Sequence, residues 1–169
     1  YLNRDIMRQA DYFSAPLKFH PRHPVKTVAV MRLLHAAQES QREALTARLY
    51  RAYWQEHVDI DDEKIIEQIA HEFGLPAMSF WRESAKSSLI KATEEAFHKK
   101  VFGVPTIEMH DRLYFGGDRL VLLAQELNLT IPDTPWSQTD GSIDFYFDFS
   151  SPYSYLAWAE VKKARERGV

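Results

Sequence analysis

Residues 143–157 have the sequence IDFYFDFSSPYSYLA. Apolar side chains at positions 143, 145, 147 and 149 alternate with more polar ones, and this two-residue period predicts a strand with one apolar face. The strand leads into Ser151-Pro152, a hydroxyl N-cap followed by the proline that favours the first helical position. Free backbone N–H groups and the helix dipole meet at such a junction, so the sequence predicts an anion site there.

Two short strands and a helix are predicted between residues 102 and 127. Residues 102–109 form the first strand, which is entered through a Gly-Val-Pro corner, and residues 113–115 form the second. The sequence Gly116-Gly117-Asp118-Arg119 then opens the helix. Its apolar face consists of Leu120, Leu123, Ala124 and Leu127.

Five helices are predicted before these strands, from apolar residues that recur at helical spacing. Their expected ranges are 3–13, 27–37, 41–56, 62–73 and 87–100. Thr27 is the expected N-cap of the second helix, and Asp61 or Asp62 that of the fourth. Gly74 follows the fourth helix, at the position where a left-handed residue ends many helices.

The composition limits the classes of function. The chain has 169 residues, of which 45% are hydrophobic and 27% charged, as in an ordinary globular protein. A net charge of −3 argues against nucleic-acid binding, which normally requires a basic surface. No apolar run approaches the ~20 residues that span a bilayer. We therefore expect no nucleic-acid or membrane partner, and a cytoplasmic location.

Together these segments resemble the family of 2-hydroxychromene-2-carboxylate isomerases and kappa-class glutathione transferases, which is related to the disulfide oxidoreductase DsbA. The motifs that carry the resemblance are DFYFDFSSPYSYLAW, VFGVPT and FGGDRL. Further matches are HPRHPVKTVAVMRLLHAA, LYRAYWQEHVDI and ATEEAFHKKVFGVPT. The resemblance covers nearly the whole chain. It implies an α/β fold with a thioredoxin-like mixed sheet and an all-helical domain inserted at about residues 27–100.

The order of the motifs differs from that of the family, because the first-strand motif comes last and the family's second strand is missing. We therefore expect a thioredoxin-like domain over residues 1–129 without its first strands, a linker over 130–142, and the first strand and helix of such a domain over 143–169. A piece of a tandem protein and a circular permutant both explain this order. The tandem piece is favoured, because a permutant made to fold should keep every strand. Residues 143–169 are expected to complete a thioredoxin-like sheet in the same or a neighbouring molecule, as a homodimer or a domain-swapped assembly.

The resemblance implies a glutathione-dependent isomerase that acts on unsaturated aromatic acids by cis/trans isomerisation. A kappa-type glutathione transferase is the nearest alternative, and a non-catalytic thioredoxin-like binding module is the alternative from another class. Thiol–disulfide exchange is excluded because the chain contains no cysteine. The place of the Cys-x-x-Cys motif is taken by Ser151-Pro-Tyr-Ser154. Residues 1–169 alone are expected to bind glutathione weakly and to isomerise little.

The resemblance places the hydroxyl of Ser151 beside the glutathione sulfur as the catalytic group, where a hydrogen bond and the helix dipole favour the thiolate. Ser150 and Ser154 are secondary candidates. An ordinary N-cap is the structural alternative for Ser151. The resemblance also implies a cis peptide bond at Val104-Pro105, which leaves the Val104 backbone free to pair with the cysteinyl unit of glutathione.

The resemblance assigns Gly117 and Asp118 to the γ-glutamyl end of glutathione. The helix N-terminus would bind the carboxylate through the Gly117 backbone, and Asp118 would face the ammonium group. Helix capping by Asp118 is the structural alternative. Relatives often carry serine or glutamine at the position of Gly117, so the affinity for glutathione could be reduced here.

Three residues near the second helix are candidates for substrate binding: Arg22, His23 and Lys26. Lys26 stands where the family usually has asparagine, and it could either hold an anionic group or be a solvated loop residue. Arg22 and His23 could contact an anionic aromatic substrate. No metal site is expected at His20 and His23, because the neighbouring prolines impose loop geometry and no further ligands complete a tetrahedral set.

Overall fold

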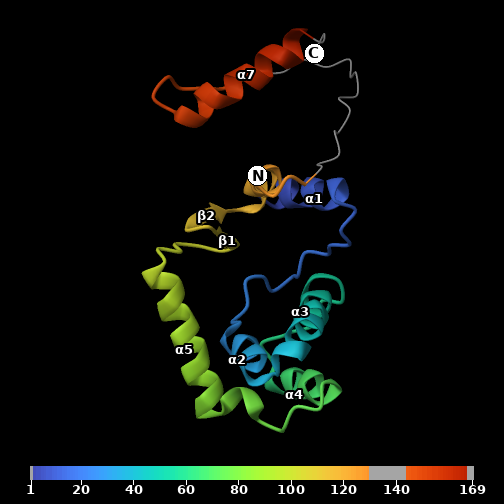
Figure 1. Ribbon diagram of the computed structural model, residues 1–169. Coiled ribbons are helices and arrows are strands. Elements are labelled where there is room, and N and C mark those ends of the chain that lie inside the picture. The colour runs from blue at the N-terminus through green and yellow to red at the C-terminus, as the bar shows by residue number, and fades with distance from the viewer. Residues whose placement is uncertain (1, 130–143, 167–169) are drawn as a thin grey trace. The chain divides into compact units, whose positions relative to one another are not determined.

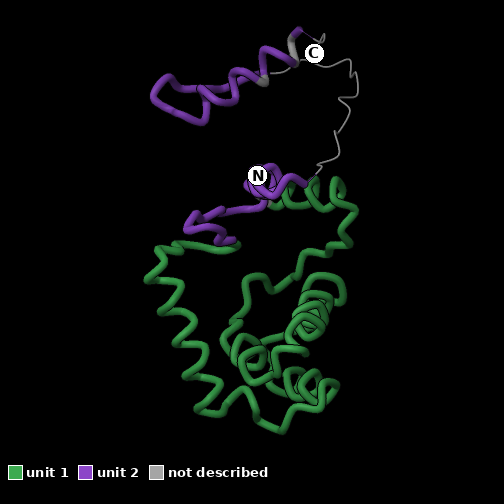
Figure 2. The backbone as a smooth tube through the Cα atoms, viewed as in Figure 1, with its two compact units in different colours: residues 1–106 green, residues 107–169 purple. Residues whose placement is uncertain are grey.

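The computed structural model describes residues 2–129 and 144–166 and is shown in Figure 1. The chain divides into two compact units, residues 1–106 and residues 107–169 (Figure 2). Among the described residues, no helix combines the length and the apolar character needed to cross a bilayer.

The first unit is helical throughout its regular part. Its elements are α1 (Leu2–Tyr12), α2 (Val28–Ala36), α3 (Glu39–Trp54), α4 (Glu63–Glu72), the 3-10 turn η1 (Ser79–Trp81) and α5 (Glu83–His98). The five predicted helices are all present. The last of them begins at Glu83 rather than at Ser87, because the extended residue Arg82 directly precedes it and an acidic side chain suits its first turn.

Helix α2 lies at the centre of the packed helices and contacts α3, α4, α5 and η1. Its inward face meets a core of fully buried side chains, the largest of which are Phe80, Leu33, Leu45, Ile66 and Ile69. Figure 1 shows α2, α3 and α4 grouped together, with α5 running past them. The core therefore fixes the start of α2 and the end of α3, where the candidate substrate-binding residues lie.

Local signals account for the ends of these helices. The side chain of Asp62 accepts a hydrogen bond from the Lys64 N–H, as the N-cap prediction requires. Gly74 has φ +65°, and its N–H bonds the His71 carbonyl at 3.0 Å. The Leu75 N–H reaches back to the Ala70 carbonyl at 3.0 Å, which completes a Schellman motif. Thr27 stands at the N-cap of α2 but makes no capping hydrogen bond with its side chain.

The second unit begins with a hairpin. Strands β1 (Thr106–Met109) and β2 (Arg112–Phe115) form a two-stranded sheet, joined by His110 and Asp111, which both have positive φ. This backbone matches the right-handed twist of the paired strands. The first strand is shorter than predicted because residues 103–105 form bends. The 3-10 turn η2 (Gly117–Arg119) and helix α6 (Leu120–Glu126) follow β2.

The C-terminal segment forms its predicted helix but not its predicted strand. Helix α7 covers Pro152–Glu166, whereas residues 144–148 have no regular secondary structure and residue 143 lies outside the described residues. The prediction of a strand is wrong for residues 144–148, because an extended segment becomes a strand only when another backbone satisfies its N–H and C=O groups. The described sheet contains only β1 and β2. Completion of a sheet by residues 143–169 stays a prediction, and the predicted linker lies outside the described residues.

Candidate functional site

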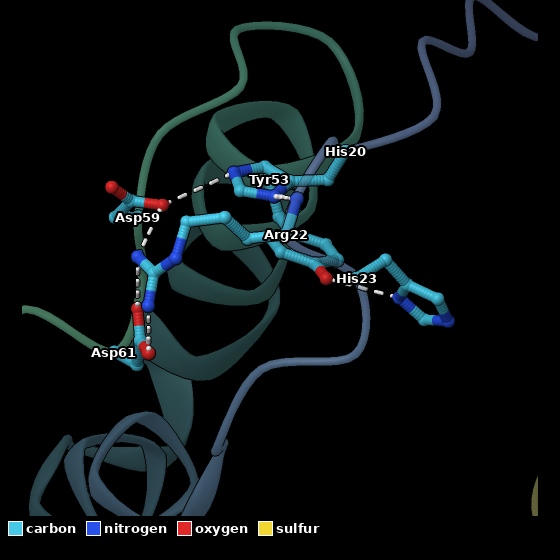
Figure 3. A network of polar contacts seen from close by, with 6 residues as sticks. All are labelled: His20, Arg22, His23, Tyr53, Asp59 and Asp61. Carbon is cyan, nitrogen blue, oxygen red and sulfur yellow. Dashed lines mark hydrogen bonds and ion pairs between the residues drawn. The ribbon is translucent and has the colours of Figure 1, made fainter.

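A polar network ties the loop before α2 to the end of α3 and the residues that follow it. The Arg22 guanidinium lies 2.7 Å from Asp59 Oδ1 and 3.0 Å from Asp61 Oδ2 (Figure 3). The hydrogen bond to Asp59 is the largest cause that raises the pKa of Arg22, and the hydrogen bond to Asp61 is the next. Two carboxylates thus balance its charge, so an anionic substrate would have to compete with them.

A histidine and a tyrosine meet in the same network. His23 Nδ1 lies 3.0 Å from the Tyr53 hydroxyl (Figure 3). The Tyr53 side chain is buried, and this burial is the main cause that raises the pKa of its phenol. The phenol therefore stays protonated and donates, while the exposed imidazole accepts when it is neutral.

An apolar pocket of about 280 Å³ opens beside this pair. Its walls come from the loop before α2, from α2 and from α3, and they include His23, Val30, Met31, Leu34, Tyr53 and Trp54. All of these residues belong to the first unit. Lys26 is exposed and does not line the pocket. Within the described residues no hydrogen bond or ion pair involves its ammonium group, so the structure brings Arg22 and His23 into one network but not Lys26.

The Val104-Pro105 peptide bond is cis, as predicted. Val104 is 86% exposed, and its backbone N–H and C=O make no hydrogen bond within the described part of the chain. The pair lies immediately before β1. An unpaired backbone unit at the start of a strand can bind an extended peptide by strand addition. The bond between His23 and Pro24 is also cis, which the sequence analysis missed.

Asp118 lies in the 3-10 turn that precedes α6. Its side chain is 72% exposed and stands 3.8 Å from the Arg119 guanidinium. It makes no capping hydrogen bond at this turn or at α6, so the structural alternative of an N-cap does not hold. Gly116 has φ +91°, and a Cβ on it would lie 2.8 Å from Asp118 Oδ1. A glycine at 116 therefore permits the close approach of this carboxylate.

Ser151 is the N-cap of α7, because its Oγ accepts a hydrogen bond from the Ser154 N–H at 3.2 Å. The hydroxyl proton has no acceptor within the described residues, so it can still be donated to an anion. Ser150 differs, because its N–H and its hydroxyl both bond Asp148 Oδ1. Both bonds lower the pKa of Asp148, and the bond from the hydroxyl has the larger effect. The Ser154 hydroxyl accepts a hydrogen bond from the Asp148 N–H at 3.4 Å and donates none within the described residues. Ser151 and Ser154 therefore both keep a hydroxyl proton that an anion could accept.

The sequence analysis missed three members of the network: Tyr53, Asp59 and Asp61. Tyr53 is a buried residue of α3, on the same face as Leu45, Leu49 and Ala52. A buried tyrosine normally has a partner for its hydroxyl, and this rule could have pointed to a polar side chain nearby. The partners of Arg22 carry no such local signal, since Asp61 is 39 residues away in the sequence.

Comparisons with known proteins agree with the fold. A family model of the DsbA-like thioredoxin domain matches residues 1–128. The 2-hydroxychromene-2-carboxylate isomerase of Pseudomonas putida is 27% identical over 73% of this chain and 62% of its own length. The enzyme of the same name from Sphingobium xenophagum is 29% identical over 73% of this chain and 65% of its own length. The chain thus spans less than two thirds of the relatives it matches.

A solved structure of 2-hydroxychromene-2-carboxylate isomerase is similar to this chain with a TM-score of 0.66 and 26% sequence identity. The similarity covers 76% of this chain and 64% of that structure. Helices α1 to α6, the cis Val104-Pro105 bond and the β1–β2 hairpin all lie within the residues that the family model matches, whereas α7 lies beyond them. Since that match extends over well more than half of the sequence, the chain belongs to the DsbA-like thioredoxin domain family.

Proposed function

We propose that this chain is part of a glutathione-dependent isomerase of the 2-hydroxychromene-2-carboxylate isomerase type. The observation that carries the proposal is that its curated relatives and a similar solved structure all have this name, at 26–29% identity. Its substrate would be an unsaturated aromatic acid. When bound, glutathione would supply a thiol that adds reversibly to the unsaturated bond, so that this bond can rotate.

Three residues, each taken by itself, have chemistry that supports the binding of such a tripeptide. The free N–H and C=O of Val104, held beside Pro105, suit the main chain of its central residue. The exposed carboxylate of Asp118 suits an ammonium group. The hydroxyl of Ser151 has a proton left to donate at the N-terminus of a 15-residue helix, and such a donor lowers the free energy of a thiolate more than that of a thiol.

Each residue has one role in this proposal. Val104 binds the main chain and Asp118 binds the amino end of glutathione. Ser151 holds the sulfur in its charged form. The proposed reaction moves no electrons to or from the protein, which is consistent with a chain that lacks cysteine.

Calorimetric titration with glutathione tests the proposal. Replacing Asp118 with asparagine removes the charge that faces the ammonium group, and we expect the affinity to fall about tenfold, because a hydrogen bond to a charged group contributes ~1.5–3 kcal/mol. Asp111→Asn is the matched control, since Asp111 is exposed in the hairpin turn with φ +61° and asparagine tolerates this conformation. Because weak binding is expected of residues 1–169 alone, the titration extends to a large excess of glutathione. Equal affinities of the two variants, or no saturable binding to the parent chain even in that excess, would contradict the proposal.

An activity assay separates the isomerase from the transferase. The isomerisation of 2-hydroxychromene-2-carboxylate is followed by absorbance while free glutathione is measured in parallel. An isomerase leaves the glutathione concentration unchanged. A kappa-type transferase consumes one equivalent for each product formed.

A further inference from the structure

The pocket beside α2 and α3 has the size and chemistry of a site for a small aromatic molecule. Its volume of about 280 Å³ lies near the lower end of the range of small-molecule pockets, ~300–1,000 Å³. A cavity of ~150 Å³ already holds benzene, so this pocket has room for one ring with a short side chain. The walls are mainly aliphatic and aromatic, with Val30 and Leu34 on one helix and Trp54 on the other.

Two of the polar side chains at this pocket meet at one point. His23 and Tyr53 both line it, and their side chains are joined by the 3.0 Å contact between Nδ1 and the hydroxyl. The ring of Tyr53 also stacks on the imidazole of His20. The rings of Phe19 and Trp54 both contact the ring of His23. The pair is therefore held in place before any ligand arrives, as a selective site requires.

We infer that this pocket binds the aromatic ring of the substrate, and that the His23–Tyr53 pair recognises a hydroxyl group on that ring. The inference rests on the proposed function for its choice of substrate class. A ring hydroxyl can both donate and accept. It can donate a hydrogen bond to the Tyr53 oxygen, and it can accept one from the Nε2–H of the neutral His23 imidazole. The apolar walls then remove the ring from water, which supplies most of the affinity.

Titration of the whole chain with 2-hydroxycinnamate, a hydroxylated unsaturated aromatic acid, tests the location. Met31 lines the pocket from a half-exposed position on α2, so Met31→Trp should fill the pocket and weaken binding more than tenfold. Val28→Trp is the matched control, because Val28 is on the same helix, is more exposed and does not line this pocket. We expect it to change the affinity less than twofold. Unchanged affinity in Met31→Trp, with its circular dichroism unaltered, overturns the inference.

A second comparison tests the recognition of the hydroxyl. Tyr53→Phe keeps the ring and its stacking and removes only the hydroxyl. The affinity for 2-hydroxycinnamate should fall about fivefold, as for the loss of a neutral hydrogen bond. The affinity for cinnamate, which lacks the ring hydroxyl, should change less than twofold. Equal losses for the two acids overturn the role given to the His23–Tyr53 pair.

Failure of this inference can be told from failure of the proposed function. If the chain binds glutathione but neither aromatic acid, the inference is overturned and the proposed function stands. If 2-hydroxycinnamate binds in a way that Met31→Trp abolishes, while glutathione does not bind, the inference holds and the proposed function is wrong.

Discussion

The imidazole of His20 stacks on the phenol ring of Tyr53, with ring centroids 4.5 Å apart and an angle of 14° between the planes. His20 is 2% exposed. Its Nδ1 accepts a hydrogen bond from the Arg22 N–H at 3.2 Å, and its Nε2 lies 3.5 Å from Asp59 Oδ1. His20 Nε2 makes no hydrogen bond within the described residues, and the Asp59 carboxylate is the charged group that lies near it. His20 therefore anchors the loop that carries Arg22 and His23 to helix α3.

We expect His20→Ala to lower the free energy of unfolding by about 2–4 kcal/mol, because the change leaves a cavity under Tyr53 and an unpaired N–H on Arg22. His20→Phe keeps the stacked ring and loses only the polar contacts, so its cost should be about half as large. Urea denaturation measures both. His71→Ala, on the exposed side of α4, is the control and should change stability by less than ~0.5 kcal/mol. A His20→Ala variant as stable as this control would show that the loop is not anchored by His20.

Gly74 provides a test of backbone conformation without a steric clash. Its φ is +65°, yet no atom lies within 4 Å of a Cβ built on it. Gly74→Ala should therefore cost about 1 kcal/mol from the left-handed conformation alone. Gly74→Asn should cost less, because asparagine visits this region more readily. Gly117→Ala, which also has open space and no positive φ, should be nearly neutral in thermal denaturation. Equal losses at the two glycines would contradict this explanation.

The elements that the sequence predicted correctly depend on neighbours in the chain. The Asp62 cap, the glycine after α4 and the helical periods of α2 to α4 each involve residues within a few positions of one another. The predicted strand at 143–149 depends instead on a partner backbone, and its alternation of aromatic residues could not reveal whether one is present. Phe149 is 96% exposed in the structure. The alternating pattern indicates an apolar face that would be stable only when buried. Whether another part of the protein buries it depends on tertiary structure, which the pattern does not contain.

The candidate site likewise has features that the sequence predicted and features that depend on how distant residues pack together. The family resemblance implied the cis bond before Pro105, a short motif predicted the N-cap at Ser151, and both are confirmed. The carboxylates that pair with Arg22 come from a separate loop, so the sequence could not show that its charge is balanced. Residues from α2 and α3 must pack together before the apolar pocket exists, and no pattern within one helix predicts its volume.

A pH-dependent contribution to stability is expected from Glu72 on α4. Arg48 of α3 holds its carboxylate through two bonds, from Nε at 2.8 Å and from a terminal nitrogen at 3.1 Å. These bonds lower the pKa of Glu72, and burial opposes them in part. Because the folded-state pKa lies below the unfolded value, the stabilisation is complete above the unfolded pKa of ~4.3. It is lost as the pH falls through the folded pKa.

Glu72→Gln should therefore destabilise the protein at pH 7 by less than about 1 kcal/mol, since both side chains are partly exposed. The difference from the parent should shrink as the pH is lowered to about 3. Denaturation midpoints at several pH values check this. Glu94→Gln is the control, because Glu94 is exposed on α5 and has no ion-pair partner within the described residues. A Glu72 effect that stays constant across this pH range would mean that packing, not charge, links α3 to α4.

Ser151→Ala separates helix capping from thiolate stabilisation, on the basis of the proposed function. The Ser151 hydroxyl accepts one hydrogen bond, from the Ser154 N–H, and its loss should cost about 1 kcal/mol of stability. The same hydroxyl would donate its proton to the glutathione sulfur, and this bond exists only while the sulfur is charged. Its loss should raise the pKa of the bound thiol by about 1–2 units, because a bond to a charged group contributes ~1.5–3 kcal/mol.

Ultraviolet absorbance of the thiolate, recorded against pH with glutathione bound, measures this shift. Ser150→Ala is the matched control, since the Ser150 hydroxyl already donates to Asp148 and has no proton left for the sulfur. Its thiol pKa should remain that of the parent chain. A raised pKa in Ser151→Ala alone assigns the thiolate contact to Ser151, whereas a thiol pKa that neither variant moves would leave Ser151 as the N-cap of α7 and nothing more.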